Sequence, residues 1–304
     1  MLVTFTRGEH PESHHRIAWC LVDAEGAVIA EGTPGDAAGQ VFPRSALKPF
    51  QTLPAARAGV LERFGLDDRH LAIACSSHGG GEEHLSLVRE ILAAAGLSEA
   101  DLGLGPLAPR DPGVGTAPAP VVHNCSGKHA MGLALCVAEG WPRQGYMLHG
   151  HPLQAAMCAA TGELTNTPPQ EIEHATDGCG MTALQVPLGA LARGFARLGA
   201  EAPGVAMRAH PPLVAFHGAV DTELMGAAPG LVAKVGAEGV LAVGTADGRG
   251  LALKVLDGAM RAIDPAGVAL AREHLGLEVP LERLARPPVM NSLGKEVGRG
   301  MVDW

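Results

Sequence analysis

A chain of 304 residues, 47% of them hydrophobic, has enough apolar material to bury a sizeable core, which excludes a disordered protein. Aromatic residues make up only 3% of the chain and its formal net charge is −9, so it lacks both the stacking platforms and the basic patches with which proteins bind nucleic acids. We therefore expect a small-molecule partner and no nucleic acid.

The distribution of apolar residues and cysteines indicates the compartment. No basic segment followed by a long apolar stretch opens the sequence, and no apolar run reaches membrane-spanning length, so we expect neither a secretory signal nor a membrane partner. The cysteines are too sparse for a disulfide scaffold, which favours buried thiols in a cytoplasmic protein. They are Cys20, Cys75, Cys125, Cys136, Cys158 and Cys179.

Strand patterns occupy both ends of the chain, and helical patterns lie between them. The first residues predict a strand, residues 14–32 a hairpin, residues 231–235 a strand, and residues 240–255 a second hairpin. Apolar spacing of three and four predicts helices over four intervening segments. These segments are 82–95, 127–139, 152–160 and 187–198.

This order of elements predicts the fold class. We expect an α/β protein of the α+β type, in which a mainly antiparallel sheet from the N- and C-terminal strands carries packed helices. The Pro- and Gly-rich segment 103–120 predicts a long loop, and neither of its flanks has the pattern of an independent core. We therefore expect one domain over residues 1–304, with the helices inserted between the two strand groups.

The segment Arg44-Ser45-Ala46-Leu47-Lys48-Pro49 carries the strongest local signal for chemistry. A helix that starts at Ser45 places Pro49 in its first turn and puts Ser45 and Lys48 on one face. A neutral lysine is the base that a serine nucleophile needs, and the positive end of a helix opposes the ammonium form. The alternative is a capping serine with a solvated lysine.

A second candidate serine follows an apolar segment. Residues 71–75 predict a buried strand that leads into Ser76-Ser77-His78-Gly79-Gly80, where small residues permit close approach of a ligand to the backbone. Ser77 then faces a substrate, or the segment is only a turn before the next helix. Lys254 interrupts an apolar strand: facing outward it is ordinary, and facing inward it would lower the pKa of Lys48 and orient Ser77.

Two cysteine-containing segments complete the set of candidates. They are Asn124-Cys125-Ser126-Gly127-Lys128-His129 and Asp177-Gly178-Cys179-Gly180, and their spacing matches no standard zinc signature. On spacing alone, two buried structural cysteines are the simpler interpretation.

Together these segments, in this order, resemble the rhizobial-type L-asparaginase family, whose fold is similar to serine β-lactamases and glutaminases. The Ser-Asp-Asn and Lys-Thr-Gly signatures of β-lactamases are absent, which argues against a β-lactam substrate. The resemblance implies a homodimer that hydrolyses L-asparagine with the serine–lysine pairs Ser45–Lys48 and Ser77–Lys254. It also implies a zinc site formed by Cys125, Lys128 and Cys179.

Three further residues are candidates for binding the substrate. The guanidinium of Arg44 matches the geometry of a carboxylate, although a surface ion pair is the alternative. Asp177 and His129 are expected to hold the substrate ammonium or a metal-bound water. A glutaminase or a penicillin-recognising acyl hydrolase would share the serine–lysine chemistry, and the non-enzymatic alternative is a zinc-stabilised amino-acid-binding protein.

Overall fold

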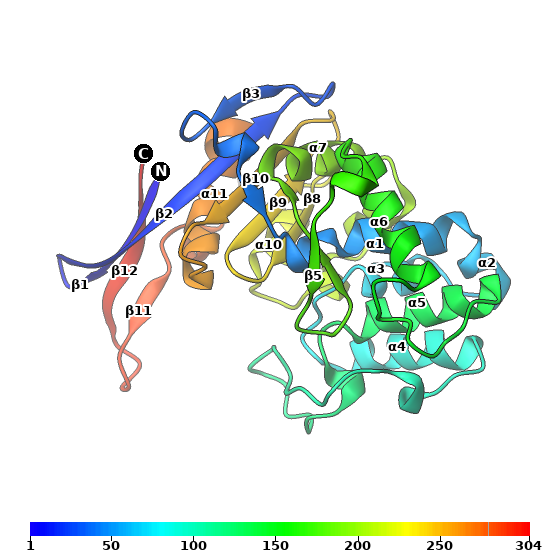
Figure 1. Cartoon of the computed structure of the whole chain (residues 1–304). Helices are drawn as coiled ribbons and strands as arrows, with labels where there is room; N and C mark the ends of the chain where they lie inside the picture. Colours follow the sequence, from blue (N-terminus) through cyan, green and yellow to red (C-terminus); the bar gives the residue numbers. More distant parts are fainter. Residues whose placement is uncertain (279) are drawn as a thin grey trace.

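The computed structural model describes residues 1–278 and 280–304 and shows a large antiparallel sheet with helices inserted between its strands (Figure 1). The eight-stranded sheet has the order β11-β12-β1-β2-β10-β9-β8, with β3 paired to β2. Its strands are β1 (Leu2–Arg7), β2 (His10–Val22), β3 (Val28–Glu31), β8 (Val232–Gly236), β9 (Val240–Gly244), β10 (Gly250–Val255), β11 (Pro288–Met290) and β12 (Glu296–Asp303). The predicted fold class is confirmed.

The helices follow the predicted segments closely. All four predicted helices are present, as α4, α5, α6 and α7, because each has an apolar stripe that packs against a neighbour. The α-helices are α1 (Lys48–Arg57), α2 (Val60–Phe64), α3 (Asp68–Ala74), α4 (Glu82–Ala94), α5 (Ser126–Glu139), α6 (Pro152–Thr165), α7 (Leu188–Leu198), α8 (Ala202–Ala209), α9 (Pro211–Val214), α10 (Val220–Ala227), α11 (Ile263–Leu275) and α12 (Glu282–Ala285).

The predicted strand at residues 71–75 is wrong, because this segment belongs to helix α3. The Asp67 side chain caps the helix by accepting hydrogen bonds from the backbone N–H groups of Arg69 and His70. In turn, the Asp67 backbone N–H donates to Nδ1 of the His70 ring. A capping box of this kind fixes the start of a helix. The short apolar run is buried on all sides, so its composition alone did not distinguish a helix from a strand.

Two strands near the C-terminus were not predicted. β12 pairs with β1, so Leu2 lies opposite Asp303, and β11 pairs with β12. Figure 1 shows both chain termini side by side on this part of the sheet. β12 contains two glycines and several exposed polar residues, which hide the alternation that marks a strand.

The sheet carries helices on both faces, and glycines set how closely one of them approaches. A Cβ atom added to Gly244 or Gly250 would overlap a carbonyl oxygen of α7, which therefore packs directly on the sheet backbone. Side chains alternate between the two faces of a sheet, and Leu241 points to the face opposite Gly244. There it contacts Gly267 of α11. Residues of β9 and β10 therefore divide between an α7 face and an α11 face.

Buried residues form two hydrophobic clusters. One lies between the sheet and α7, α10 and α11, and the other joins α3, α4 and α5 with the loops beside them. The hairpin of β5 (His174–Thr176) and β6 (Thr182–Leu184), and the pair of β4 (Gln40–Val41) and β7 (Val186–Pro187), lie outside the main sheet. The candidate residues Cys125 and Cys179 belong to the second cluster.

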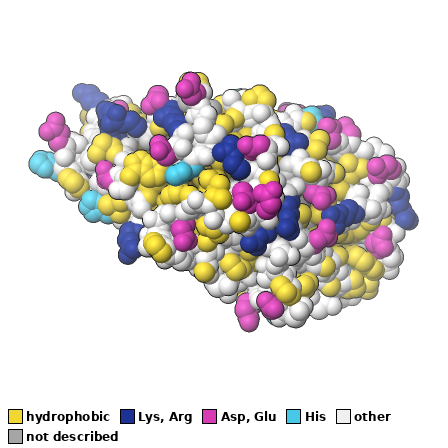
Figure 2. Space-filling view, turned by 90° about the horizontal axis from the view of Figure 1, so that it is seen from above, with side chains coloured by type: hydrophobic (Ala, Val, Ile, Leu, Met, Phe, Trp, Pro, Cys, Tyr) yellow, Lys and Arg dark blue, Asp and Glu magenta, His cyan; other side chains and the backbone are white. Residues whose placement is uncertain are grey.

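The outer surface is mixed in charge. Figure 2 shows basic and acidic side chains interspersed with hydrophobic ones over the face in view. Among the described residues, no helix combines the length and apolar character needed to cross a membrane.

Strand β8 approaches the backbone of the Ser-x-x-Lys segment very closely. This segment is the 3₁₀ helix η2 (Arg44–Leu47), which leads directly into α1. A Cβ atom on Gly236 would overlap the Pro43 carbonyl oxygen and lie 3.3 Å from the Ala46 nitrogen. Only glycine permits this contact, because neither backbone segment can move independently of its element.

We predict that Gly236→Ala destabilises the fold, because the methyl group overlaps the Pro43 carbonyl. The expected loss is about 1–3 kcal/mol or more, measured by urea unfolding. Gly226→Ala is the matched control: Gly226 lies inside α10 with open space around it, so the same change should stabilise by about 0.5–1 kcal/mol. Equal effects of the two substitutions would contradict the close contact between β8 and η2.

Candidate active site

Lys48 is the most deeply buried ionisable residue of the Ser-x-x-Lys segment, with an exposed fraction of 1%. Its amine donates to the Ser76 carbonyl at 2.5 Å, to the Ser77 hydroxyl at 3.1 Å and to the Asn124 carbonyl at 3.1 Å. The Ser45 hydroxyl is not among these partners. The alternative of a solvated Lys48 is therefore wrong: Lys48 is the first residue of α1, Pro49 follows it in the first turn, and the Lys48 side chain lies inside the protein.

Burial also changes the acidity of Lys48. Desolvation is the main reason that the pKa of Lys48 is lowered to about 8, and the positive charges of Lys234 and Lys128 act in the same direction against the opposing effect of Cys125. A pKa in this range leaves a useful fraction of the amine neutral near physiological pH. The environment of Lys48 therefore permits it to serve as a base.

Ser45 lies at the start of the same segment and is partly exposed. The residue before it, Arg44, has a φ of 54°, which is a left-handed conformation that non-glycine residues rarely adopt. The cost of such a conformation is of order 1–3 kcal/mol and is found most often at functional sites. Ser45 is thus presented from a sharp turn, where a ligand can reach its hydroxyl.

Ser77 lies in the loop between α3 and α4 and is held from several sides. Its backbone N–H donates to the Val214 carbonyl, and its carbonyl accepts from Arg110. The next residue, His78, is fully buried and its ring contacts the Ser126 hydroxyl at 2.8 Å. The loop is fixed by these contacts, so the Ser77 side chain is placed with little freedom beside Lys48.

Lys254 does not lie beside these serines, which corrects the predicted Ser77–Lys254 pair. Its amine donates to the Glu238 carbonyl at 2.5 Å and to the Val255 carbonyl at 2.6 Å, at the end of the sheet. The physical reason is the strand order: β9 lies between β10, which carries Lys254, and the edge strand β8.

Lys234 of β8 is the strand lysine next to the site, and it was not among the residues predicted from the sequence. Its side chain is fully buried and forms an ion pair with Asp221 of α10 at 3.1 Å. Its position opposite Ala242 places it on the same face as Gly236 and η2. Burial lowers the pKa of Lys234, and Asp221 opposes this shift.

Cys125, Lys128 and Cys179 lie close together in the structure: Cys125 precedes α5, Lys128 belongs to α5, and Cys179 lies at the tip of the β5–β6 hairpin. The Lys128 amine lies 3.6 Å from the Cys179 sulfur. A hydrogen bond from Cys179 is the main reason that the pKa of Cys125 lies well below its usual value, and Lys48 and Lys128 add to the effect. All three side chains are buried.

His129 adds a nitrogen beside this group. Its Nδ1 lies 2.7 Å from the Tyr146 hydroxyl, whereas its buried Nε2 has no hydrogen-bond partner within the described part of the chain. Burial lowers the pKa of His129 to about 4, so the ring is neutral. A neutral imidazole nitrogen is a donor that suits zinc, but this one does not form a three-donor group with the two cysteines.

The donor set fits a metal only if lysine takes part. No three His, Cys, Asp or Glu side chains in residues 1–278 and 280–304 gather in a metal-binding arrangement. Burial opposes a charge on Lys128, but Cys179, Cys125 and Asp177 outweigh it and raise its pKa. A metal ion would therefore have to displace the Lys128 proton to use this nitrogen.

Arg44 and Asp177 form a partly buried ion pair at 2.7 Å next to the cysteines. Burial alone would raise the pKa of Asp177, but Arg44 and Lys128 reverse the effect and keep it below its usual value. The Asp177 backbone N–H donates to the Met181 carbonyl, which closes the tip of the hairpin. The predicted binding residues Arg44, Asp177 and His129 thus surround the cysteines and Lys128.

Comparisons with known proteins give one family match and a match among solved structures. A family model described as L-asparaginase II matches residues 3–302, which is nearly the whole chain. Among solved structures, a β-lactamase from Mycobacterium bovis matches with 15% identity and a TM-score of 0.41, over 84% of this chain and 94% of that one. A search of curated proteins gives no match.

Proposed function

The chain belongs to the L-asparaginase II family, and we propose that this amidohydrolase cleaves the side-chain amide of L-asparagine to L-aspartate and ammonia. The observation that carries the proposal is the Lys48 amine, which is buried, has a lowered pKa and lies 3.1 Å from the Ser77 hydroxyl. The proposal extends to a homodimer, as the resemblance implies, and to the cytoplasm, as the sparse cysteines favour.

Ser45 is the proposed nucleophile because it is the more accessible serine. It is partly exposed, whereas Ser77 is only 2% exposed. The Ser45 proton passes by way of the Ser77 hydroxyl to neutral Lys48 while the Ser45 oxygen bonds to the amide carbon. The C–N bond then breaks, the nitrogen takes up the proton and leaves as ammonia, and a β-aspartyl ester remains on Ser45.

Water completes the reaction with the same groups. Lys48 removes a proton from water, the resulting C–O bond forms at the ester carbon, and the Ser45 oxygen leaves and regains a proton through Ser77. Lys234 supports both steps, since its positive charge disfavours the ammonium form of Lys48. In this proposal Lys234 has the role that the sequence suggested for Lys254.

The resident metal is proposed to be zinc, held by Cys125, Lys128 and Cys179. When bound, zinc supplies a positive charge that orients the polar groups of the substrate next to Ser45. Arg44 is proposed to bind the substrate α-carboxylate, and Asp177 the α-ammonium. His129 lies beside the same cluster, where its unpartnered Nε2 would bind a metal-bound water.

Ser45→Ala should lower ammonia release from L-asparagine by roughly 10³-fold or more, because a nucleophile and its base act as a unit. Thermal unfolding should be nearly unchanged. Ser292→Ala, at an exposed position, is the control and should keep full activity. Turnover by Ser45→Ala at the normal rate would remove Ser45 from the mechanism. L-glutamine and a β-lactam tested in parallel distinguish the related acyl hydrolases.

Replacement of the two strand lysines tests which of them serves the site. Lys234→Gln keeps a hydrogen-bond donor for Asp221 but loses the charge, so it should lower kcat by about 10²-fold or more. Lys254→Gln, in the same sheet but bonded to backbone carbonyls at its end, should stay within about threefold of the native enzyme. The reverse pattern would restore Lys254 to the serine–lysine pair.

Elemental analysis of the purified protein tests the metal site independently of turnover. The native chain should contain zinc, and Cys179→Ser should lose most of it because a hydroxyl is a much poorer zinc ligand than a thiolate. Cys158→Ser, at a half-buried cysteine outside the cluster, should retain the native content. Unchanged zinc in Cys179→Ser would exclude the proposed ligand set.

A further inference from the structure

A buried histidine that the proposed reaction does not use lies next to the proposed catalytic residues. His78 directly follows Ser77, is fully buried, and its Nε2 lies 2.8 Å from the Ser126 hydroxyl. The Ser126 hydroxyl donates in turn to the Val121 carbonyl at 2.8 Å. Ser126 is also fully buried and is the first residue of α5. These contacts join the loop before α4 to the segment before α5.

The direction of these hydrogen bonds is fixed by their partners. A carbonyl can only accept, so the single proton of the Ser126 hydroxyl goes to Val121, and the Ser126 oxygen accepts from the histidine ring. His78 therefore carries its proton on Nε2. Burial is the main reason that the pKa of His78 lies well below its usual value, so the ring is neutral. His78 thus acts as a neutral donor to Ser126.

The Lys48 amine is held between the same two parts of the chain. It donates to the Ser76 carbonyl and the Ser77 hydroxyl in the loop before α4, and to the Asn124 carbonyl before α5. An ammonium group has three N–H donors for these three acceptors, whereas a neutral amine has two N–H donors and a lone pair. Because the two carbonyls can only accept, they take both N–H groups. The lone pair is then left for the Ser77 hydroxyl.

This arrangement gives the two carbonyls a part in the proposed reaction, on which the inference rests. With its lone pair toward Ser77, neutral Lys48 can accept the Ser77 proton while the Ser77 oxygen takes up the proton of Ser45. If the carbonyls of Ser76 and Asn124 move apart, one N–H loses its acceptor and the lone pair loses its direction. Misplacement of a catalytic group by about 1 Å can lower the rate about 10²-fold.

We propose that His78 is a positioning residue for Lys48. Its hydrogen bond to Ser126 ties together the two segments whose carbonyls direct the lone pair of the amine toward the neighbouring hydroxyl. His78 and Ser126 each come two residues after one of these carbonyls in the sequence, so the bond joins the segments next to both.

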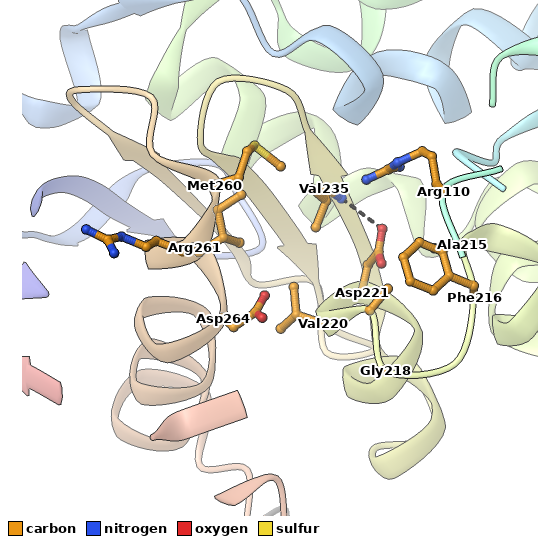
Figure 3. A pocket seen from close by; sticks show the side chains of 12 residues that line it. Arg110, Ala215, Phe216, Gly218, Val220, Asp221, Val235, Met260, Arg261 and Asp264 are labelled. Atoms are coloured by element: carbon orange, nitrogen blue, oxygen red, sulfur yellow. Dashed lines mark hydrogen bonds between the residues drawn. The ribbon is translucent and has the colours of Figure 1, made fainter. Parts of the chain in front are cut away.

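Other contacts hold the loop before α4 against different parts of the chain. The Gly79 N–H donates to the Ala215 carbonyl, and Arg110 donates to the Ser77 carbonyl at 3.2 Å. Arg110 and Ala215 line a cavity of about 290 Å³ (Figure 3). Neither partner belongs to the segment before α5, whereas the bond from His78 reaches its end.

Kinetics of the full chain with L-asparagine test the proposal through both partners of the bond. His78→Leu and Ser126→Ala should each lower kcat by roughly 10- to 100-fold and leave KM within about threefold, because neither residue is a proposed substrate-binding group. The double variant should be no slower than the slower single variant, since both changes remove the same bond. His78→Gln, whose amide can present an N–H donor near the place of Nε2, should restore kcat to within about fivefold of the native value.

His70→Leu is the matched control, because His70 is also buried and is bonded to Asp67 and Glu90 at helix α3. It should lower the temperature of thermal unfolding but keep kcat within about threefold of the native value. This comparison separates a positioning role from a purely structural one. Thermal unfolding verifies that each variant is folded; if His78→Leu does not fold, Ser126→Ala and His78→Gln carry the test with the same expected values.

The outcomes separate this inference from the function on which it rests. A native chain that releases no ammonia from L-asparagine would overturn the proposed function, and the inference with it. An active native chain whose kcat is unchanged by His78→Leu or Ser126→Ala would overturn the inference alone. So would single losses that multiply in the double variant, or a loss of kcat in His70→Leu as large as that in His78→Leu.

Discussion

The amine of Lys48 connects three parts of the chain that are otherwise distant. It comes from the start of α1 and binds carbonyls of Ser76, before α4, and Asn124, before α5, as well as the Ser77 hydroxyl. A buried amine without these acceptors would carry a large desolvation cost, so the position of one group specifies the positions of two loops. The cysteines and the Arg44–Asp177 pair are arranged around this junction.

Close backbone contacts bring the segments around the Lys48 amine near one another. Gly236 brings β8 against the Pro43 carbonyl, and Gly127 brings the start of α5 so near the Ile73 carbonyl that an added Cβ would overlap it. Both glycines lie next to residues of the site: Gly236 follows Lys234, and Gly127 lies between Cys125 and Lys128. The sheet and the helices can thus contribute side chains to one small volume because their backbones touch there.

Much of the fold followed from periodicity, and the errors have physical causes. The helices with clear apolar stripes and the two hairpins were predictable because local pattern and tertiary packing agree there. Residues 71–75 are buried on every side, so they have no polar face to reveal their period. β12 is identified by its pairing with β1, which no local pattern encodes.

The site was predictable where the chemistry lies in short motifs. Ser45, Lys48, Ser77 and the cysteine segments were found because each motif is contiguous in sequence. Lys234 was missed because Lys234 and Lys254 both interrupt apolar strands. The local sequence does not show that Lys234 lies in the edge strand β8 and Lys254 in β10, which is separated from β8 by β9. The relevant signal, a glycine two residues later that permits contact with η2, has meaning only once the strand order is known.

The pairing of Leu2 with Asp303 has a consequence for how the protein is made. Strands β1 and β2 leave the ribosome first, but their partners β10 and β12 follow only after the whole helical region. Helices with local contacts form quickly, whereas pairings between distant segments form slowly. β1 and β2 pair with each other, but during most of its synthesis a nascent chain leaves open the edges that later pair with β12 and β10. Lys234 joins Lys48 only when the late strands dock.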